Sequence, residues 1–141
     1  MTFGLVIGLV GHADPVNANR STIQVTIDGL RSNDGTVYVA IYDNPDAFPK
    51  WNVHRVATRT TAQNGQAVAE FRNLDPGNYA MAFFHDENSN GEFDQGLFGF
   101  PLEGYGFSND AKPKLGPPPF EEAAFAVNDG GAVTLKAQMQ Y

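Results

Sequence analysis

Short runs in which apolar and polar side chains alternate recur along this chain, and they constrain its fold most strongly. Apolar residues occupy every second position over 23–27 and again over 37–41. A period of two places successive side chains on opposite faces, which is typical of a half-buried β-strand. No stretch shows a convincing helical period, so we expect an all-β protein.

Turn residues divide the chain into seven expected strands. Asn64-Gly65 is the strongest short hairpin signal, and Asp75-Pro76-Gly77 predicts a further turn. The expected strands cover residues 23–27, 37–41, 54–62, 65–71, 78–85, 120–127 and 132–139. The last two are expected to form a closing hairpin. Seven short antiparallel strands predict a two-sheet Greek-key β-sandwich.

Length and composition exclude several classes of protein. The chain has 141 residues, a formal net charge of −7 and no cysteine. This length suits one domain with its own core. The negative charge argues against a nucleic-acid partner, and the lack of cysteine excludes thiol catalysis and cysteine-ligated metal centres. No apolar run reaches the roughly 18 residues expected of a membrane-spanning helix.

Residues 1–18 have features of an export signal. Residues 2–10 are apolar or small, and small residues follow at cleavage-site spacing, although no Lys or Arg precedes the apolar run. We therefore expect a signal peptide over 1–18, a single mature domain over 19–141 and a periplasmic or secreted protein. A frayed apolar tail or a first strand is the alternative.

The net charge comes from one segment. Between Arg72 and Lys112 there is no Lys or Arg, whereas the rest of the chain is neutral. The seven acids of this segment are Asp75, Asp86, Glu87, Glu92, Asp94, Glu103 and Asp110. Solvent or a bound cation must offset such an excess. Within it, residues 86–119 are rich in Gly, Pro and aromatic residues, and we expect one long ordered loop that folds over an end of the sandwich.

Residues 86–94 match the pattern D-x-N-x-N-G-x-x-D of calcium-binding loops. Oxygen atoms at positions 1, 3 and 5 converge on a hard cation when Gly91 allows a sharp turn, and positions 7 and 9 add ligands. The predicted Ca²⁺ ligands are Asp86, Asn88, Asn90, Glu92 and Asp94.

Position 12 of this loop departs from the EF-hand pattern. It is Leu97, where an EF-hand has a bidentate Glu. Glu103 is the nearest downstream acid and our first candidate to complete the site, ahead of Glu92 and Asp43. Because two ligands are Asn, we expect weak binding, with a Kd of about 10⁻⁴ to 10⁻³ M. A solvated acidic turn without metal is the alternative.

Aromatic residues outside the expected strands form a second candidate site. If these rings are exposed together, they can stack on a carbohydrate or bind a peptide at the cell envelope. The alternative is that they pack against one another as the hydrophobic core of the loop. These residues are Trp51, Phe100, Tyr105 and Phe107.

Catalysis has weaker support. His85 adjoins Asp86, but no Ser, Lys or second His follows at a spacing that implies a nucleophile. We therefore favour a strand-end histidine, assign no catalytic residue and expect no enzyme. A hydrolase built on clustered carboxylates remains an alternative, and it requires a cleft around Glu103 and Asp94 with an acid of raised pKa.

Several strings resemble the bacterial domain-of-unknown-function family 2141. The resembling segments are 35–42, 74–80, 84–91, 98–101, 103–109 and 119–125, of which E-G-Y-G-F-S-N at 103–109 is the most specific. The resemblance implies an exported, transthyretin-like or carboxypeptidase-regulatory-like sandwich, and it supplies no catalytic residues. Residues 86–94 also resemble calcium-binding loops of surface-adhesin repeats. We thus predict a non-enzymatic exported binding module in which Ca²⁺ orders the long loop.

Overall fold

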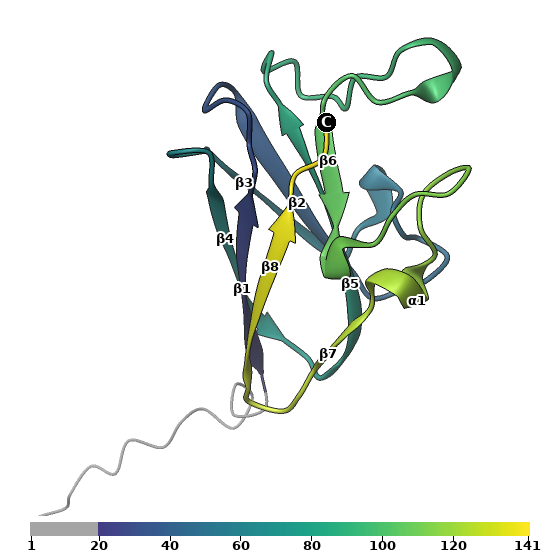
Figure 1. Ribbon diagram of the computed structural model, residues 1–141. Helices are drawn as coiled ribbons and strands as arrows, with labels where there is room; N and C mark the ends of the chain where they lie inside the picture. The colour runs from purple at the N-terminus through teal and green to yellow at the C-terminus, as the bar shows by residue number, and fades with distance from the viewer. Residues whose placement is uncertain (1–19) are drawn as a thin grey trace, which may run out of the picture.

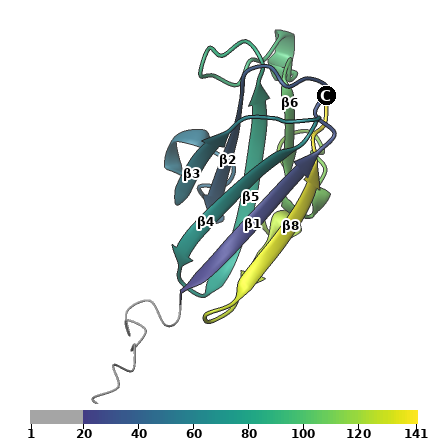
Figure 2. The ribbon, with the colours of Figure 1, turned by 90° about the vertical axis from the view of Figure 1, so that its left-hand side faces the viewer.

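Two β-sheets pack face to face in the computed structural model, which describes residues 20–141 (Figures 1 and 2). The expected signal peptide over 1–18 lies outside the described residues. One sheet has the order β4-β1-β8, formed by β4 (Ala67–Leu74), β1 (Ser21–Asp28) and β8 (Ala132–Gln138). The other has the order β3-β2-β5-β6, formed by β3 (Val56–Thr60), β2 (Thr36–Tyr42), β5 (Gly77–Asp86) and β6 (Gly104–Phe107), with β7 (Phe125–Val127) paired to β5. The all-β, two-sheet prediction is confirmed.

The main core lies between the two sheets and follows the alternation in the sequence. Ile23, Val25 and Ile27 of β1 are fully buried, and intervening residues of the same strand are more exposed. They meet alternate residues of β2 and β5 from the other sheet. The period-two pattern therefore buries one face of each strand, as expected for a sandwich.

A second core covers the outer face of the β3-β2-β5-β6 sheet. Its buried members include Tyr42, Phe48, Phe107 and Phe120. The covering segments contain the short helices η1 (Trp51–Val53), η3 (Ser108–Asp110) and α1 (Phe120–Ala123). A further short helix, η2 (Leu97–Gly99), lies between β5 and β6, and none of its described side chains belongs to this core. Because both faces of β5 are covered, its residues 79–86 are all buried, which explains the continuous apolar run there. None of the described helices is long and apolar enough to cross a membrane.

The strand count and the antiparallel prediction are wrong. The described residues form eight strands, and β1 pairs with β8 in parallel. The expected closing hairpin does not form, because β7 pairs with β5 while β8 pairs with β1. The predicted strand over 120–127 begins instead with α1, and only 125–127 is extended.

The turn at Asn64-Gly65 is present, but its hairpin is only one bridge long. Both residues have positive φ, and Gln63 and Gln66 exchange backbone hydrogen bonds of 2.8 and 3.0 Å. Beyond this bridge, β3 joins one sheet and β4 the other. The local signal specified the turn correctly, whereas burial of each strand in a different sheet decided their partners.

Strand β6 was missed because it lies inside the expected loop over 86–119 and contains two glycines. A Cβ on Gly106 would lie 2.3 Å from a ring carbon of Phe83 and 2.9 Å from the Gln138 carbonyl oxygen. A Cβ on Gly104 would lie 2.5 Å from the Tyr141 ring. Glycine disfavours a strand by propensity but is required here by close packing.

Ser108 ties the covering segments to the sheet, so its removal is expected to be costly. Its buried hydroxyl donates to the Ala123 carbonyl and accepts from the Met81 amide at 2.9 Å. Ser108→Ala leaves buried backbone groups unpaired and should lower the unfolding free energy by about 1–3 kcal/mol in urea denaturation. The exposed Thr61→Ala is the control, with an expected change within about 0.5 kcal/mol. Equal effects of the two variants would contradict this role.

Candidate functional site

The acidic loop begins at the end of β5, where Asp86 is almost fully buried. Its two carboxylate oxygens accept hydrogen bonds from the backbone amides of Asn90, at 3.1 Å, and Gly91, at 2.8 Å. Gly91 has a φ of +78°, a conformation that L-residues with a side chain rarely adopt. The sequence therefore forms the tight turn that the D-x-N-x-N-G spacing predicts.

Asn88 and Asn90 orient the rest of the turn around Asp94. Their side-chain oxygens accept from the backbone amides of Asn90, at 3.3 Å, and Glu92, at 2.9 Å. Their amide nitrogens donate to the two carboxylate oxygens of Asp94, each at 2.7 Å. Asp86, Asn88, Asn90 and Asp94 thus gather in one turn.

A narrow hairpin brings Glu103 back to Asp94. The Leu102 amide donates to the Asp94 carbonyl oxygen at 3.0 Å, and the Gly96 amide donates to the Phe100 carbonyl oxygen at 2.7 Å. Leu97, at position 12 of the loop pattern, lies near the tip of this hairpin with 84% of its surface exposed. Glu103 is 5% exposed, and neither of its carboxylate oxygens has a hydrogen-bond donor.

The pKa values of Glu103 and Asp94 are shifted in opposite directions. Burial raises the pKa of Glu103 to about 8, and the neighbouring Asp94 carboxylate and the negative charge of Asp86 raise it further. The pKa of Asp94 is lowered by the neighbouring Glu103 carboxyl and by hydrogen bonds from Asn90 and Asn88. At neutral pH a protonated Glu103 therefore lies beside an ionised Asp94, and no hydrogen bond satisfies the Glu103 carboxyl oxygens.

The carboxylates alone do not form a metal cage. Within residues 20–141, no group of three or more His, Asp or Glu side chains is arranged to hold a metal ion. A metal site here needs amide or carbonyl oxygens as well, which are donors that hard cations accept. The predicted ligand Glu92 is exposed, and its backbone, not its carboxylate, enters the turn.

A cleft of about 460 Å³ lies beside this carboxyl pair. It is lined by Arg31, Glu87, Asn88, Asp94, Gln95, Leu102 and Glu103. Arg31 is engaged by Glu87 at 2.6 Å and lies over the Tyr141 ring. The geometric condition for the hydrolase alternative, a cleft next to an acid of raised pKa, is therefore met.

His85 has no free nitrogen for general-base catalysis. It is fully buried, with Nδ1 2.9 Å from the Tyr141 hydroxyl and Nε2 2.6 Å from the Asp34 carbonyl oxygen. Asp43 lies just beyond β2, at the end opposite the Thr36–Asp86 pair, and contacts Arg55 at 3.4 Å. The geometry supports the reading of His85 as a structural residue and separates Asp43 from the acidic loop.

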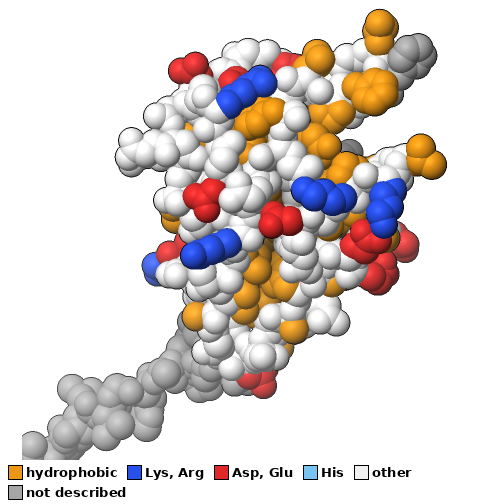
Figure 3. Space-filling view, viewed as in Figure 1, with side chains coloured by type: hydrophobic (Ala, Val, Ile, Leu, Met, Phe, Trp, Pro, Cys, Tyr) orange, Lys and Arg blue, Asp and Glu red, His pale blue; other side chains and the backbone are white. Residues whose placement is uncertain are grey.

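Three of the four predicted aromatic residues line one apolar groove of about 210 Å³. They are Trp51, Tyr105 and Phe107, whereas Phe100 is 69% exposed and not part of the lining. Phe84 and Phe93 complete the groove and were missed. The i, i+2 spacing of Tyr105 and Phe107 is the sequence signal that could have placed these two side chains on the same face of a strand. In Figure 3 apolar surface extends between the two loops that project on the right in Figure 1.

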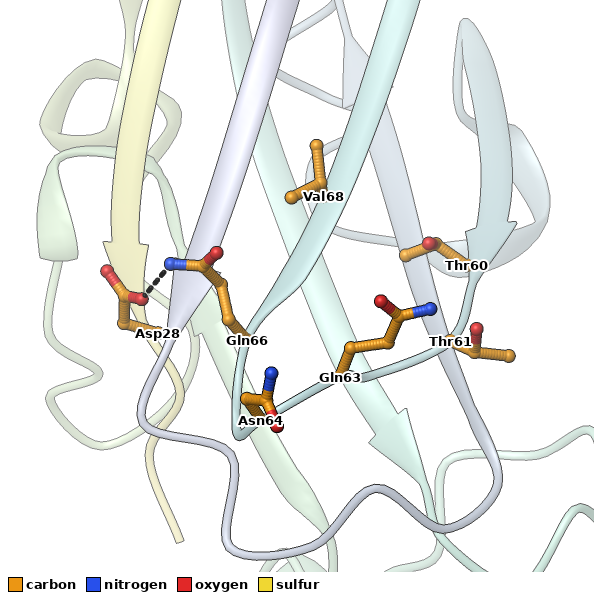
Figure 4. A pocket seen from close by; sticks show the side chains of 7 residues that line it. All are labelled: Asp28, Thr60, Thr61, Gln63, Asn64, Gln66 and Val68. Atoms are coloured by element: carbon orange, nitrogen blue, oxygen red, sulfur yellow. Dashed lines mark hydrogen bonds between the residues drawn. The ribbon is translucent and has the colours of Figure 1, made fainter.

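A wider, polar hollow of about 530 Å³ lies where the chain crosses between the sheets (Figure 4). It is lined by Asp28, Thr60, Thr61, Gln63, Asn64, Gln66 and Val68. Gln66 donates to Asp28 at 2.7 Å, and most of the other lining side chains are exposed to solvent. It contains no buried unpaired group, so it does not define a chemical site.

Fold and site together define a class: a two-sheet β domain with an acidic turn, a buried Glu103 carboxyl beside Asp94 and an aromatic groove on one sheet. The chain belongs to the family DUF2141, described as an uncharacterized protein conserved in bacteria, which matches residues 25–136. This range includes the acidic turn and nearly all of both sheets. Comparison with curated proteins and with solved structures gave no match.

Proposed function

We propose that this protein is an exported β-sandwich module that binds Ca²⁺ at the acidic turn. The observation that carries the proposal is Glu103, a buried acid with two unpartnered oxygens beside Asp94. A buried carboxylate without a donor is unfavourable. A cation between Glu103 and Asp94 supplies the missing partner and replaces the acid that Leu97 does not provide.

The turn offers the remaining oxygen ligands. Asn88 and Asn90 already contact Asp94 through their amides. A rotation of each amide turns its oxygen toward a cation beside Asp94, in exchange for the hydrogen bonds that these oxygens accept from the Asn90 and Glu92 backbone amides. Asp86 keeps the turn closed through the Asn90 and Gly91 amides. Binding at such a site orders the hairpin that connects Asp94 to Glu103, because both ends of the hairpin then hold the same ion.

Calcium titration of the metal-stripped chain tests this proposal. We expect a Kd of about 10⁻⁴ to 10⁻³ M and, at ten times the Kd, a gain of about 1.4 kcal/mol in unfolding free energy. Asp94→Asn should abolish both the calorimetric signal and the gain. Asp75→Asn removes the same charge from the same base-free segment outside the turn and should retain them. Wild-type protein that gives no heat and no shift with 10 mM Ca²⁺ would refute the proposal.

The raised pKa of Glu103 and the adjoining cleft favour a second candidate, a carboxylate-based hydrolase. In that case Glu103 acts as general acid and Asp94 as the ionised partner. Turnover of a glycoside panel in EDTA, lost in Glu103→Gln, would support this candidate over the metal site. The first proposal also includes export to the periplasm or the medium and a relationship to transthyretin-like sandwiches. Both parts rest on the sequence.

A further inference from the structure

Aromatic rings form a box on the outer face of the β3-β2-β5-β6 sheet. Phe84 of β5 is 4% exposed and forms the floor. The Trp51 ring is inclined by 72° to it at 4.8 Å between centroids, and the Phe93 ring by 52° at 5.4 Å. Tyr105 continues the wall, 6.0 Å from Phe93. Trp51, Phe93 and Tyr105 are half-buried, so part of each ring remains accessible.

Acidic residues adjoin this box on one side. On its other sides, Lys112 and Lys114 shortly precede the lining residue Pro117, and Arg59 lies over the Tyr38 ring that stacks on Phe84. None of the residues that line it carries a charge. Phe93 lies between Glu92 and Asp94, in the segment that has seven acids and no Lys or Arg. Lys50, which precedes Trp51 in the sequence, is exposed and does not line the groove. Ring faces and neighbouring carboxylates both generate negative potential.

We propose that this box binds an organic cation of the quaternary-ammonium class. The faces of Trp, Tyr and Phe attract a cation without hydrogen bonds, which suits an alkylated ammonium group that has no N–H donor. The groove volume of about 210 Å³ fits a small head group. A sugar is less suited because it needs many hydrogen bonds. Among the described lining residues, only the Gln95 amide, the Tyr105 hydroxyl and the Trp51 indole N–H offer side-chain hydrogen-bonding groups.

Trp51 is the single tryptophan of the chain, so its fluorescence reports occupancy of the box directly. Choline and its uncharged carbon analogue 3,3-dimethyl-1-butanol are titrated in EDTA, which separates this site from any metal effect. Both probes have the same shape and hydroxyl group, and only the charge differs. We expect choline to bind about tenfold more tightly than the neutral analogue.

Substitutions to Leu keep apolar volume but remove the ring face. Phe93→Leu and Tyr105→Leu should each weaken choline binding at least about threefold while leaving the neutral analogue nearly unchanged. Phe100→Leu removes an exposed aromatic ring outside the groove and is the matched control. Lys50→Gln should tighten choline binding. Thermal melts verify that each variant is folded.

Two results would overturn the inference. Equal affinity for choline and its neutral analogue would show that the groove is a general apolar pocket. No change in Trp51 fluorescence at choline concentrations up to about 50 mM would show that the box does not bind the cation. Neither result bears on Ca²⁺ binding, since the box is assayed without metal. Conversely, if the protein binds choline but gives no heat and no gain in stability with Ca²⁺, this inference stands and only the metal site is refuted.

Discussion

Replacing Glu103 with Gln is expected to stabilise the metal-free protein at pH 8–9 and, in the same variant, to remove its response to Ca²⁺. The Gln amide has nearly the same shape as the protonated acid, but it carries no ionisable proton and no charge. The gain at high pH should be about 1–3 kcal/mol, the usual penalty for a buried unsatisfied polar group. Urea denaturation with EDTA and with Ca²⁺ measures both effects.

The pH dependence follows from the direction of the pKa shift. The ordinary pKa of the Glu103 carboxyl is 4.5, and it rises to about 8 in the folded protein. The stabilisation from the protonated form is therefore complete below about pH 4.5 and is lost as the pH rises through 8. The difference between wild type and Glu103→Gln should grow across this window. Calcium binding to wild type should tighten over the upper part of it, because the ion displaces the proton.

Glu122→Gln is the control for charge alone. Glu122 is exposed on α1, so this substitution removes one carboxylate outside the site. It should alter neither the pH profile nor the calcium response. A Glu103→Gln protein that is less stable than wild type at pH 9 without metal would contradict the assignment of Glu103 as an unfavourably buried acid. One that still gains stability with Ca²⁺ would remove Glu103 from the metal site.

Gly35→Ala is expected to be the most destabilising single substitution near the acidic turn. Gly35 has a φ of +70°, and a Cβ there would lie 1.9 Å from the Asp86 carbonyl oxygen. Because that atom is backbone, relief requires β2 and the end of β5 to separate where they pair, at Thr36 and Asp86. We expect a loss of about 3–5 kcal/mol, from left-handed strain and overpacking together.

Gly99→Ala separates these two causes. Gly99 has a φ of +75°, but a Cβ there would have no atom within 4 Å. It should therefore cost only the conformational strain of about 1–2 kcal/mol. Chemical denaturation of both variants measures the difference. Similar losses for the two would show that φ alone, and not the approach to Asp86, explains the need for glycine at position 35.

The close approach of Gly35 to Asp86 also shows which parts of the fold a local pattern encodes. Alternation in β1 and β2 predicted which faces are buried, and Asn64-Gly65 predicted a turn with two positive φ values. Neither pattern contains the identity of the neighbouring strand. The parallel pairing of β1 with β8 and the separation of β3 from β4 arise from burying two sheets against each other.

The candidate site divides in the same way. The turn from Asp86 to Asp94 is local, since each hydrogen bond spans at most six residues, and the sequence pattern predicted it. The approach of Glu103 depends on a hairpin that places Leu97 at its tip, and the aromatic box depends on β5, β6 and η1 meeting at one face.

Side-chain alternation and turn chemistry act over a few residues, so the all-β class, the family and the acidic turn could be predicted from the sequence. Two further features depend on tertiary packing: Glu103 lies beside Asp94, and the rings of Trp51, Phe93 and Tyr105 surround Phe84. Each of these contacts spans nine or more residues, further along the chain than any hydrogen bond of the acidic turn. They form because the long segment after β5 must bury its own apolar side chains on the outer face of the sheet.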